Sequence, residues 1–155
     1  MYNENRNSAL VALEGIFDIV LNSVSLLAAY VVCVIIYFKN SNIMAENSAE
    51  RTAFLSQFGW KISEDPVEIS EVIIPADFDA GYLEYAEMNK AQGLDLEPYK
   101  GMRAKRWTYD VLNYPNFENT AGTVQANLLV FEGKVIGGDV CSLEMGGFIH
   151  GFEKP

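Results

Sequence analysis

Residues 19–38 contain no charged side chain (IVLNSVSLLAAYVVCVIIYF), and no other feature limits the architecture of this chain as strongly. An α-helix of this length spans about 30 Å, which is the thickness of the hydrocarbon core of a bilayer. Tyr30, Tyr37 and Phe38, followed by Lys39, resemble the aromatic and basic belt found at a membrane interface. The stretch therefore predicts a transmembrane helix over residues 19–38, preceded by an N-terminal tail, residues 1–18.

Two other interpretations of this stretch stay open, because only residues 26–38 are strongly apolar. A run of that length also suits a buried helix of a soluble protein or the core of a signal peptide. Arg6 lies too far from the run to form a basic n-region, and no small-residue cleavage site follows Phe38. Cys33 also lacks the small preceding residues of a lipoprotein cleavage site. We therefore expect a retained anchor.

Beyond a polar linker, residues 39–47, the chain predicts one domain over residues 48–155. Helical spacing of apolar residues predicts a helix over residues 49–58, which starts from Asn47 or Ser48, and a second helix from Asp77 or Asp79 to about residue 92. Strand patterns occupy residues 60–64, 67–74, 105–111, 124–131 and 134–142. Glu132 and Gly133 suit a two-residue hairpin turn between the last two strands.

These elements predict an α+β fold, because no crossover helix separates the last strands and the sheet must be antiparallel there. We expect an N-terminal transmembrane helix followed by an antiparallel sheet of about four strands packed with two helices. The second helix is expected to cover the apolar face of the sheet.

The formal net charge of −10 argues against a nucleic-acid partner, because such proteins neutralise phosphates with clustered cations. The sequence contains one cluster of basic residues, Lys100, Arg103, Lys105 and Arg106. We expect these cations to pair with the acidic second helix at a solvated strand end. The other interpretation is a ligand or headgroup patch, which keeps Arg106 as a candidate binding residue.

The strand at residues 105–111 alternates between two faces. Trp107 and Tyr109 share one face, whereas Arg106, Thr108 and Asp110 share the other, which predicts a strand with one wet face. Trp107, Tyr109 and Tyr114 are candidate residues of an exposed aromatic binding surface.

His150 is the only histidine, so a catalytic Ser-His-Asp or Cys-His arrangement would have to use it. Asp139 or Asp110 would be its carboxylate partner. The glycine-rich surroundings of His150 (GGFIHGFEKP) predict a mobile tail or an edge strand. Cys33 lies in the predicted membrane span and Cys141 in a predicted strand, so the two cannot pair within one chain. The sequence predicts no metal site and no cofactor.

Gly137, Gly138 and Asp139 match the first part of the diguanylate cyclase signature, but Val140 and Cys141 follow where an acidic residue and Phe are required. We therefore reject that match. Paired glycines in a strand predict a bulge or the close approach of a neighbouring side chain, for which Trp107 or Tyr109 is a candidate.

Several short segments between residues 51 and 151 carry a resemblance to a known family. They include WTY at residues 107–109, NYP at 113–115, ANLLV at 126–130, VIGGD at 135–139, and Gly147-Phe148 with His150-Gly151. The chain resembles a domain of unknown function from clostridial and related Gram-positive bacteria, found in short proteins with an N-terminal anchor or signal segment. The resemblance implies an extracytoplasmic bacterial domain and no particular activity.

Two functions from different classes follow as hypotheses. The first is a single-pass, membrane-anchored, non-catalytic binding or regulatory domain on the outer side of the cell membrane. Its partner would be a membrane or cell-envelope protein or a peptide. The second is a small cell-envelope hydrolase or transferase that uses His150 with a carboxylate. The charges flanking the anchor, Arg6 on one side and Lys39 and Arg51 on the other, nearly balance, so the outward orientation rests on the resemblance.

Overall fold

The computed structural model describes residues 26–28, 30–31, 43–118 and 120–155. The chain divides into two compact units, residues 1–41 and residues 42–155. In the first unit the described residues are helical, and their large side chains, Leu26, Leu27, Tyr30 and Val31, are exposed. The residues that can be described form no helix long and apolar enough to cross a membrane. Most of the predicted span over residues 19–38 lies outside the described residues.

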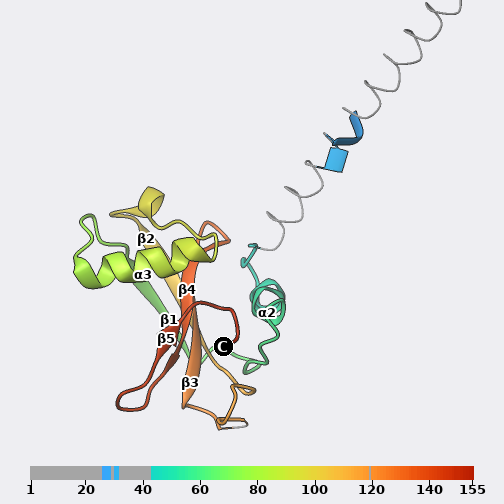
Figure 1. Cartoon of the computed structure of the whole chain (residues 1–155), viewed down its shortest axis with the longest axis vertical. Helices are drawn as coiled ribbons and strands as arrows, with labels where there is room; N and C mark the ends of the chain where they lie inside the picture. Colours follow the sequence, from blue (N-terminus) through green and yellow to red (C-terminus); the bar gives the residue numbers. More distant parts are fainter. Residues whose placement is uncertain (1–25, 29, 32–42, 119) are drawn as a thin grey trace, which may run out of the picture. The chain divides into compact units, whose positions relative to one another are not determined.

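Residues 42–155 form an α+β domain built on one five-stranded antiparallel sheet (Figure 1). The strands follow one another across the sheet in chain order: β1 (Glu68–Ile73), β2 (Arg103–Asp110), β3 (Val124–Phe131), β4 (Lys134–Ser142) and β5 (Ile149–His150). The helices are α2 (Ser48–Ser56), α3 (Ala80–Ala91) and a short 3₁₀ helix, η1 (Glu97–Tyr99). The predicted α+β class is confirmed.

Local signals in the sequence place the helix starts and the last hairpin. The Asn47 side chain accepts a hydrogen bond from the Glu50 amide, and the Asp79 carboxylate accepts one from the Tyr82 amide, so both residues are N-caps. Glu132 and Gly133 both have positive φ, which is the geometry of a two-residue turn joining two twisted strands.

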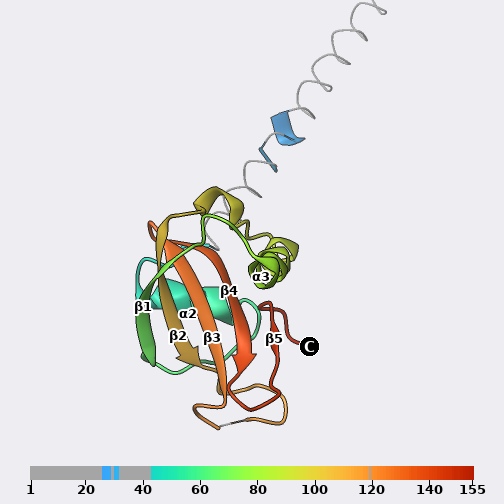
Figure 2. The same ribbon diagram turned by 90° about the vertical axis from the view of Figure 1, so that its left-hand side faces the viewer.

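The sheet carries a helix on each face, α2 on one side and α3 on the other (Figures 1 and 2). The larger core lies on the α2 side, where Phe54, Leu55 and Trp60 meet the inward residues of β2, β3 and β4. The smaller core lies under α3 and η1 and contains Ile74, Leu96, Ala104, Leu129 and Ile136. The second helix, α3, covers an apolar face of the sheet as predicted, but that face is one of two and carries the smaller core. α2 covers the main face together with the C-terminal segment, which contributes Phe152.

Two segments of the domain differ from the sequence prediction. Residues 60–64 form no strand and contribute only an isolated bridge from Ile62 to Val111. Residues 43–45, which the sequence assigns to the linker, pair with the β3–β4 hairpin through the Ala45 amide and the Ile43 carbonyl. The C-terminal segment forms the edge strand β5, which pairs with β4 and is one of the two alternatives predicted for it.

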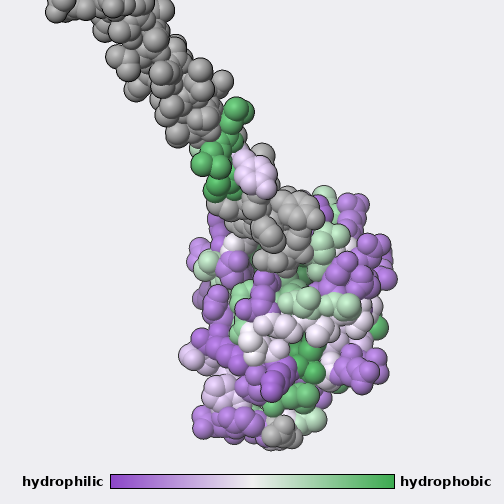
Figure 3. Space-filling view, turned by 90° about the vertical axis from the view of Figure 1, so that its right-hand side faces the viewer, coloured by the Kyte–Doolittle hydropathy of each residue, from purple (hydrophilic) through white to green (hydrophobic). Residues whose placement is uncertain are grey.

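The surface over α2 is mainly hydrophilic, with hydrophobic residues in small patches (Figure 3). Beneath it, the Arg51 side chain is only 5% exposed. Its Nε donates to the Tyr109 hydroxyl at 2.8 Å, and its Nη1 donates to the carbonyls of Ala45 and Glu46 at 3.0 and 3.1 Å. The guanidinium also lies 3.6 Å from the centre of the Trp107 ring. One buried cation thus joins residues 45–46 and α2 to β2.

We expect Arg51→Ala to lower the free energy of unfolding by about 3 kcal/mol. The substitution removes hydrogen bonds from a charged donor, each worth about 1.5–3 kcal/mol, and leaves the Tyr109 hydroxyl without that partner. Urea unfolding followed by tryptophan fluorescence measures the loss. The matched control is Arg103→Ala, whose exposed ion pair with Glu71 is worth less than about 1 kcal/mol. Equal losses in the two variants would contradict a structural role for Arg51.

Candidate binding site

A pocket of about 280 Å³ opens between α3 and the sheet. Val72 and Leu129 supply its apolar part, and Tyr82 and Tyr85 reach it from α3. Polar groups come from three adjacent strands. Arg106 on β2 lies directly across from Leu129 on β3, and Asn127, two residues before Leu129, lies directly across from Asp139 on β4, so Arg106, Asn127 and Asp139 share one face of the sheet.

Asp139 is the buried anion of this pocket, with 6% of its surface exposed. Its Oδ1 accepts a hydrogen bond from the Tyr85 hydroxyl at 3.0 Å, and its Oδ2 accepts one from Asn127 Nδ2 at 2.9 Å. Asn127 is oriented in turn by Thr108, whose hydroxyl donates to Asn127 Oδ1 at 2.8 Å. Among the described residues, no Lys, Arg or His forms an ion pair with Asp139. The carboxylate is therefore held by neutral donors.

Burial raises the pKa of Asp139 above its ordinary value of 3.8, although the hydrogen bonds from Asn127 and Tyr85 and the charge of Arg106 oppose the rise. Burial also raises the pKa of Tyr85 well above 10.0, helped by the neighbouring Asp139 charge. Cys141 lies on the same strand face, and burial with the Asp139 charge raises its pKa to about 11. The Cys141 thiol therefore stays protonated near neutral pH, which argues against its use as a nucleophile.

Arg106 is the cation of the pocket. Its Nη2 donates to Glu68 on β1 at 2.8 Å, and its Nε is buried without a hydrogen-bond partner. A guanidinium carries five N–H donors, and this is the one hydrogen bond that Arg106 makes to the described residues. The Nη groups therefore keep N–H donors that make no hydrogen bond to the described residues.

The cluster of basic residues does not pair with the acidic helix α3, which corrects the sequence prediction. Lys100 pairs with Glu97, Arg103 with Glu71 and Arg106 with Glu68. The last two acids lie on β1, directly beside β2, so the antiparallel register brings these charges together. The expected wet face of β2 is also wrong in part. Thr108 and Asp110 are polar but buried.

The three aromatic candidates do not form an exposed surface. Tyr109 is fully buried and Tyr114 is 7% exposed, because α2 and the segment after β5 cover their face of the sheet. Trp107 is partly buried, and the Arg51 guanidinium covers its ring. These residues belong to the core and its edge.

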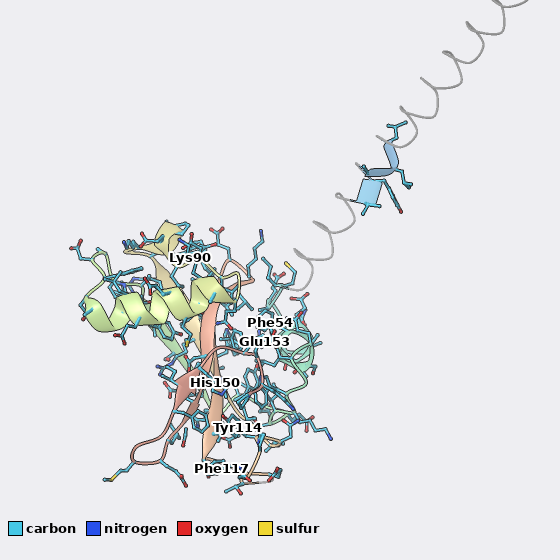
Figure 4. The ribbon with its side chains drawn as sticks, viewed as in Figure 1. Phe54, Lys90, Tyr114, Phe117, His150 and Glu153 are labelled. Atoms are coloured by element: carbon cyan, nitrogen blue, oxygen red, sulfur yellow. The ribbon has the colours of Figure 1, made fainter. Side chains whose placement is uncertain are left out.

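His150 lies away from both carboxylates proposed for it. It is directly across from Val140 and so faces the α2 side, whereas Asp139 and Asp110 face the α3 side. Its Nε2 is 3.1 Å from the Tyr114 hydroxyl and its Nδ1 is 2.6 Å from the Gly151 carbonyl oxygen. Figure 4 shows His150 beside Tyr114. The histidine is part of an aromatic cluster.

The glycine pair is approached by residues other than Trp107 or Tyr109, which corrects that expectation. Leu96 and Asn89 crowd Gly137, whereas the Asn127 carbonyl and the Phe152 ring crowd Gly138. The bulge predicted for this region is confirmed: the register shifts between Leu129 and Val130, and the extra residue, Ile136, lies on β4 beside Gly137.

Sequence reasoning missed four members of the site: Tyr82, Tyr85, Thr108 and Asn127. One signal was available, since Asn127 interrupts an apolar strand (VQANLLVF) and a polar residue there requires a hydrogen-bond partner. The two tyrosines carry no such signal, because their spacing on α3 equally suits core packing.

A second pocket, of about 420 Å³, lies at the β1–β2–β3 end on the α2 side. Its lining includes Glu71 and Arg103, which already pair with each other, and Trp107, which Arg51 covers. Within the described ranges, no group of His, Cys, Asp and Glu side chains is arranged to hold a metal ion. Arg106 of the α3 pocket is paired as well, but that pocket also contains the buried carboxylate of Asp139, which has no cationic partner among the described residues, so it is the stronger candidate.

A five-stranded antiparallel sheet with a helix on each face and a polar pocket under one helix defines a small α+β domain. The family model described as Domain of unknown function (DUF4830) matches residues 54–140, more than half of the chain, and the chain belongs to that family. The matched range contains every residue that lines the α3 pocket. No curated protein and no solved structure matches the chain.

Proton linkage at Asp139 gives a testable pH dependence. An acid whose pKa is raised by folding binds more protons in the folded than in the unfolded state between the two pKa values. The free energy of unfolding therefore falls as pH rises from about 3.8 through the raised pKa. We expect wild type to lose stability relative to Asp139→Asn over this window, by about 1.4 kcal/mol for each unit of the shift.

Urea unfolding of both proteins across the acidic range measures this difference. Asp139→Asn also loses hydrogen bonds, but this loss changes its free energy of unfolding by nearly the same amount at every pH. The pH dependence of the difference between wild type and variant therefore reports the titration of Asp139. A wild-type stability that rises relative to Asp139→Asn over the same window would show that the folded environment favours the charged carboxylate.

Proposed function

We propose that this protein is a non-catalytic binding or regulatory domain, held at a bacterial membrane by residues 19–38 with the domain on the outer side. We further propose that the pocket between α3 and the sheet is its binding site. The observation that carries the proposal is that Arg106 and Asp139 line one pocket without pairing with each other. Arg106 pairs with Glu68, whereas the buried Asp139 has no cationic partner among the described residues. A buried charge without an opposite charge costs stability, which favours a role in binding.

The positions of the reactive side chains support a non-catalytic role. His150 lies on the face of the sheet opposite Asp139 and Asp110, and the raised pKa of Cys141 keeps its thiol protonated. No specific observation favours a hydrolase or transferase that uses His150. The anchor is supported by the uncharged length of residues 19–38 and by the exposed apolar side chains of Leu26, Leu27 and Val31.

Binding at the pocket is tested with the full chain in detergent micelles, labelled with ¹⁵N and titrated with a library of small polar fragments. We expect saturable shifts of the Asn127, Gly138 and Asp139 amides, while the Phe117 amide in a distant loop stays unchanged. Shifts spread evenly over the surface, or none at all, would remove the pocket as a binding site.

Localisation is tested separately by expressing the full chain in a Gram-positive host and treating intact cells with protease. We expect the chain to sediment with membranes and its C-terminal domain to be degraded. A variant lacking residues 19–38 should leave the membrane fraction. A domain protected in intact cells but degraded after lysis would overturn the outward orientation.

A further inference from the structure

We infer that the α3 pocket takes a small zwitterion, a molecule that carries a carboxylate and a protonated amine a few bonds apart, such as a free amino acid. This inference rests on the proposed function and names its ligand class. It follows from the placement of one cation and one anion on the same pocket, with aromatic rings beside the anion.

The carboxylate end is assigned to Arg106. Its one hydrogen bond to the described residues goes from Nη2 to Glu68, which is half-exposed on the outer strand β1, so the Nη groups keep further N–H donors in a side chain that lines the pocket. Guanidinium donors match the two oxygens of a carboxylate in a planar, bidentate contact.

The ammonium end is assigned to Asp139. Each of its oxygens accepts one hydrogen bond from Tyr85 or Asn127, and each retains acceptor capacity for a further donor. Tyr82 and Tyr85 lie on the same pocket, and tyrosine ring faces attract cations. A ligand ammonium would give the buried carboxylate the opposite charge that the described residues do not provide.

The backbones of the two charged residues are far enough apart to leave room for a small ligand. Arg106 and Asp139 lie on β2 and β4 with β3 between them, so their backbones are about 10 Å apart across the sheet, and the register offsets them by about 7 Å along it. A volume of about 280 Å³ is near the lower end of small-molecule sites, about 300–1,000 Å³. A purely anionic ligand would place a second negative charge beside Asp139, and a purely cationic one would meet Arg106.

The probes are the twenty common free amino acids and β-alanine, titrated into the full chain by calorimetry, with the amide shifts of Asn127 and Asp139 as the site readout. We expect at least one to bind saturably. Its N-acetyl derivative, which lacks the ammonium, and its methyl ester, which lacks the carboxylate, should each bind at least about tenfold more weakly, the loss of one charged contact.

Variants assign each end of the ligand. Arg106→Gln should abolish the preference for the free acid over the ester, and Asp139→Asn should abolish the preference for the free amine over the N-acetyl form. The matched control is Arg103→Gln, which breaks a similar β1–β2 ion pair on the other face of the sheet and should leave binding unchanged. If either pocket variant fails to fold, the affinities of wild type for the free amino acid, its N-acetyl derivative and its methyl ester still test whether the ligand is a zwitterion.

The outcomes separate this inference from the proposed function. If neutral or singly charged fragments shift the pocket amides but no amino acid does, the ligand is not a zwitterion, although the pocket remains a binding site. If the N-acetyl form binds as tightly as the free amino acid, the ligand is an anion and the assignment of Asp139 is overturned. If no fragment and no amino acid binds, the proposed function fails as well.

Discussion

Replacing Gly138 with alanine is expected to lower the free energy of unfolding by more than about 4 kcal/mol and to leave little folded domain. A Cβ at this position would lie 2.1 Å from the Asn127 carbonyl oxygen and 2.5 Å from Phe152 Cζ. The first contact is with backbone of the central strand β3, which cannot move without breaking its pairing with β2 and β4. The Gly138 φ of +153° is also a conformation that residues with a side chain rarely adopt.

The same glycine also fixes the end of α3 to the sheet. The Gly138 amide donates to Asn89 Oδ1 at 2.7 Å, and its carbonyl accepts from Gln92 Nε2 at 3.2 Å. Any shift of this backbone would displace both partners and, one residue later, Asp139. We therefore expect Gly138→Ala to disturb the pocket even in the folded molecules that remain.

Urea unfolding of the full chain, followed by fluorescence, measures the loss, because both tryptophans of the chain, Trp60 and Trp107, lie in the domain. The control is Gly146→Ala, where φ is +75° and no atom lies within 4 Å of the added Cβ. That variant should lose only about 1–2 kcal/mol through backbone strain. Similar losses in the two variants would show that strain alone, and not the contact with β3, sets the cost at Gly138.

Replacing Phe152 with alanine is expected to lower the free energy of unfolding by about 3–5 kcal/mol, the cost of removing a buried aromatic ring. The Phe152 ring is fully buried and packs edge-on against Phe54, with 5.1 Å between ring centres. It also contacts Phe58, whose ring centre is 5.5 Å away. Phe152 lies beyond residue 140, so this prediction tests whether the fold extends past the range of the family match.

The backbone of Phe152 holds the C-terminal segment in place independently of the ring. Its carbonyl accepts from Trp60 Nε1 at 2.6 Å, and its amide donates to Gln92 Oε1 at 2.7 Å. Both bonds can persist in Phe152→Ala, so the loss reports the ring. Phe117→Ala, which removes a partly buried ring at the edge of the same cluster (Figure 4), is the control and should cost clearly less. A loss below about 1 kcal/mol for Phe152→Ala would place the C-terminal segment outside the cooperative unit.

Short-range features of the sequence predicted much of the domain correctly. Asn47 and Asp79 were among the predicted caps, and each acts on an amide three residues away. The Glu132-Gly133 turn depends only on the residues that form it. The strands at residues 124–131 and 134–142 have the predicted bounds, because their long apolar runs and the turn between them define both ends. In these cases the determining interactions lie within a few residues of one another.

The candidate site was only partly predictable, because its groups meet through the sheet. Arg106 and Asp139 were named from the sequence, but as members of different sites, and they lie on strands separated by β3. Asn127 accepts a hydrogen bond from Thr108 on β2 and donates one to Asp139 on β4. Both contacts depend on the register of a strand pair, which the sequence of one strand does not specify. His150 was assigned to the wrong partners, because its side of the sheet follows from pairing with Val140.

The sequence by itself determined the α+β class, the starts of both helices, the last hairpin and the alternation of residues along β2. Only the tertiary structure decided which face of the sheet each helix covers, and therefore that Tyr109 and Tyr114 are core residues while Arg106 and Asp139 line a pocket. The physical reason is that alternation specifies which residues share a face. Burial depends on what packs on that face, and here that includes the C-terminal Phe152, which is distant in sequence.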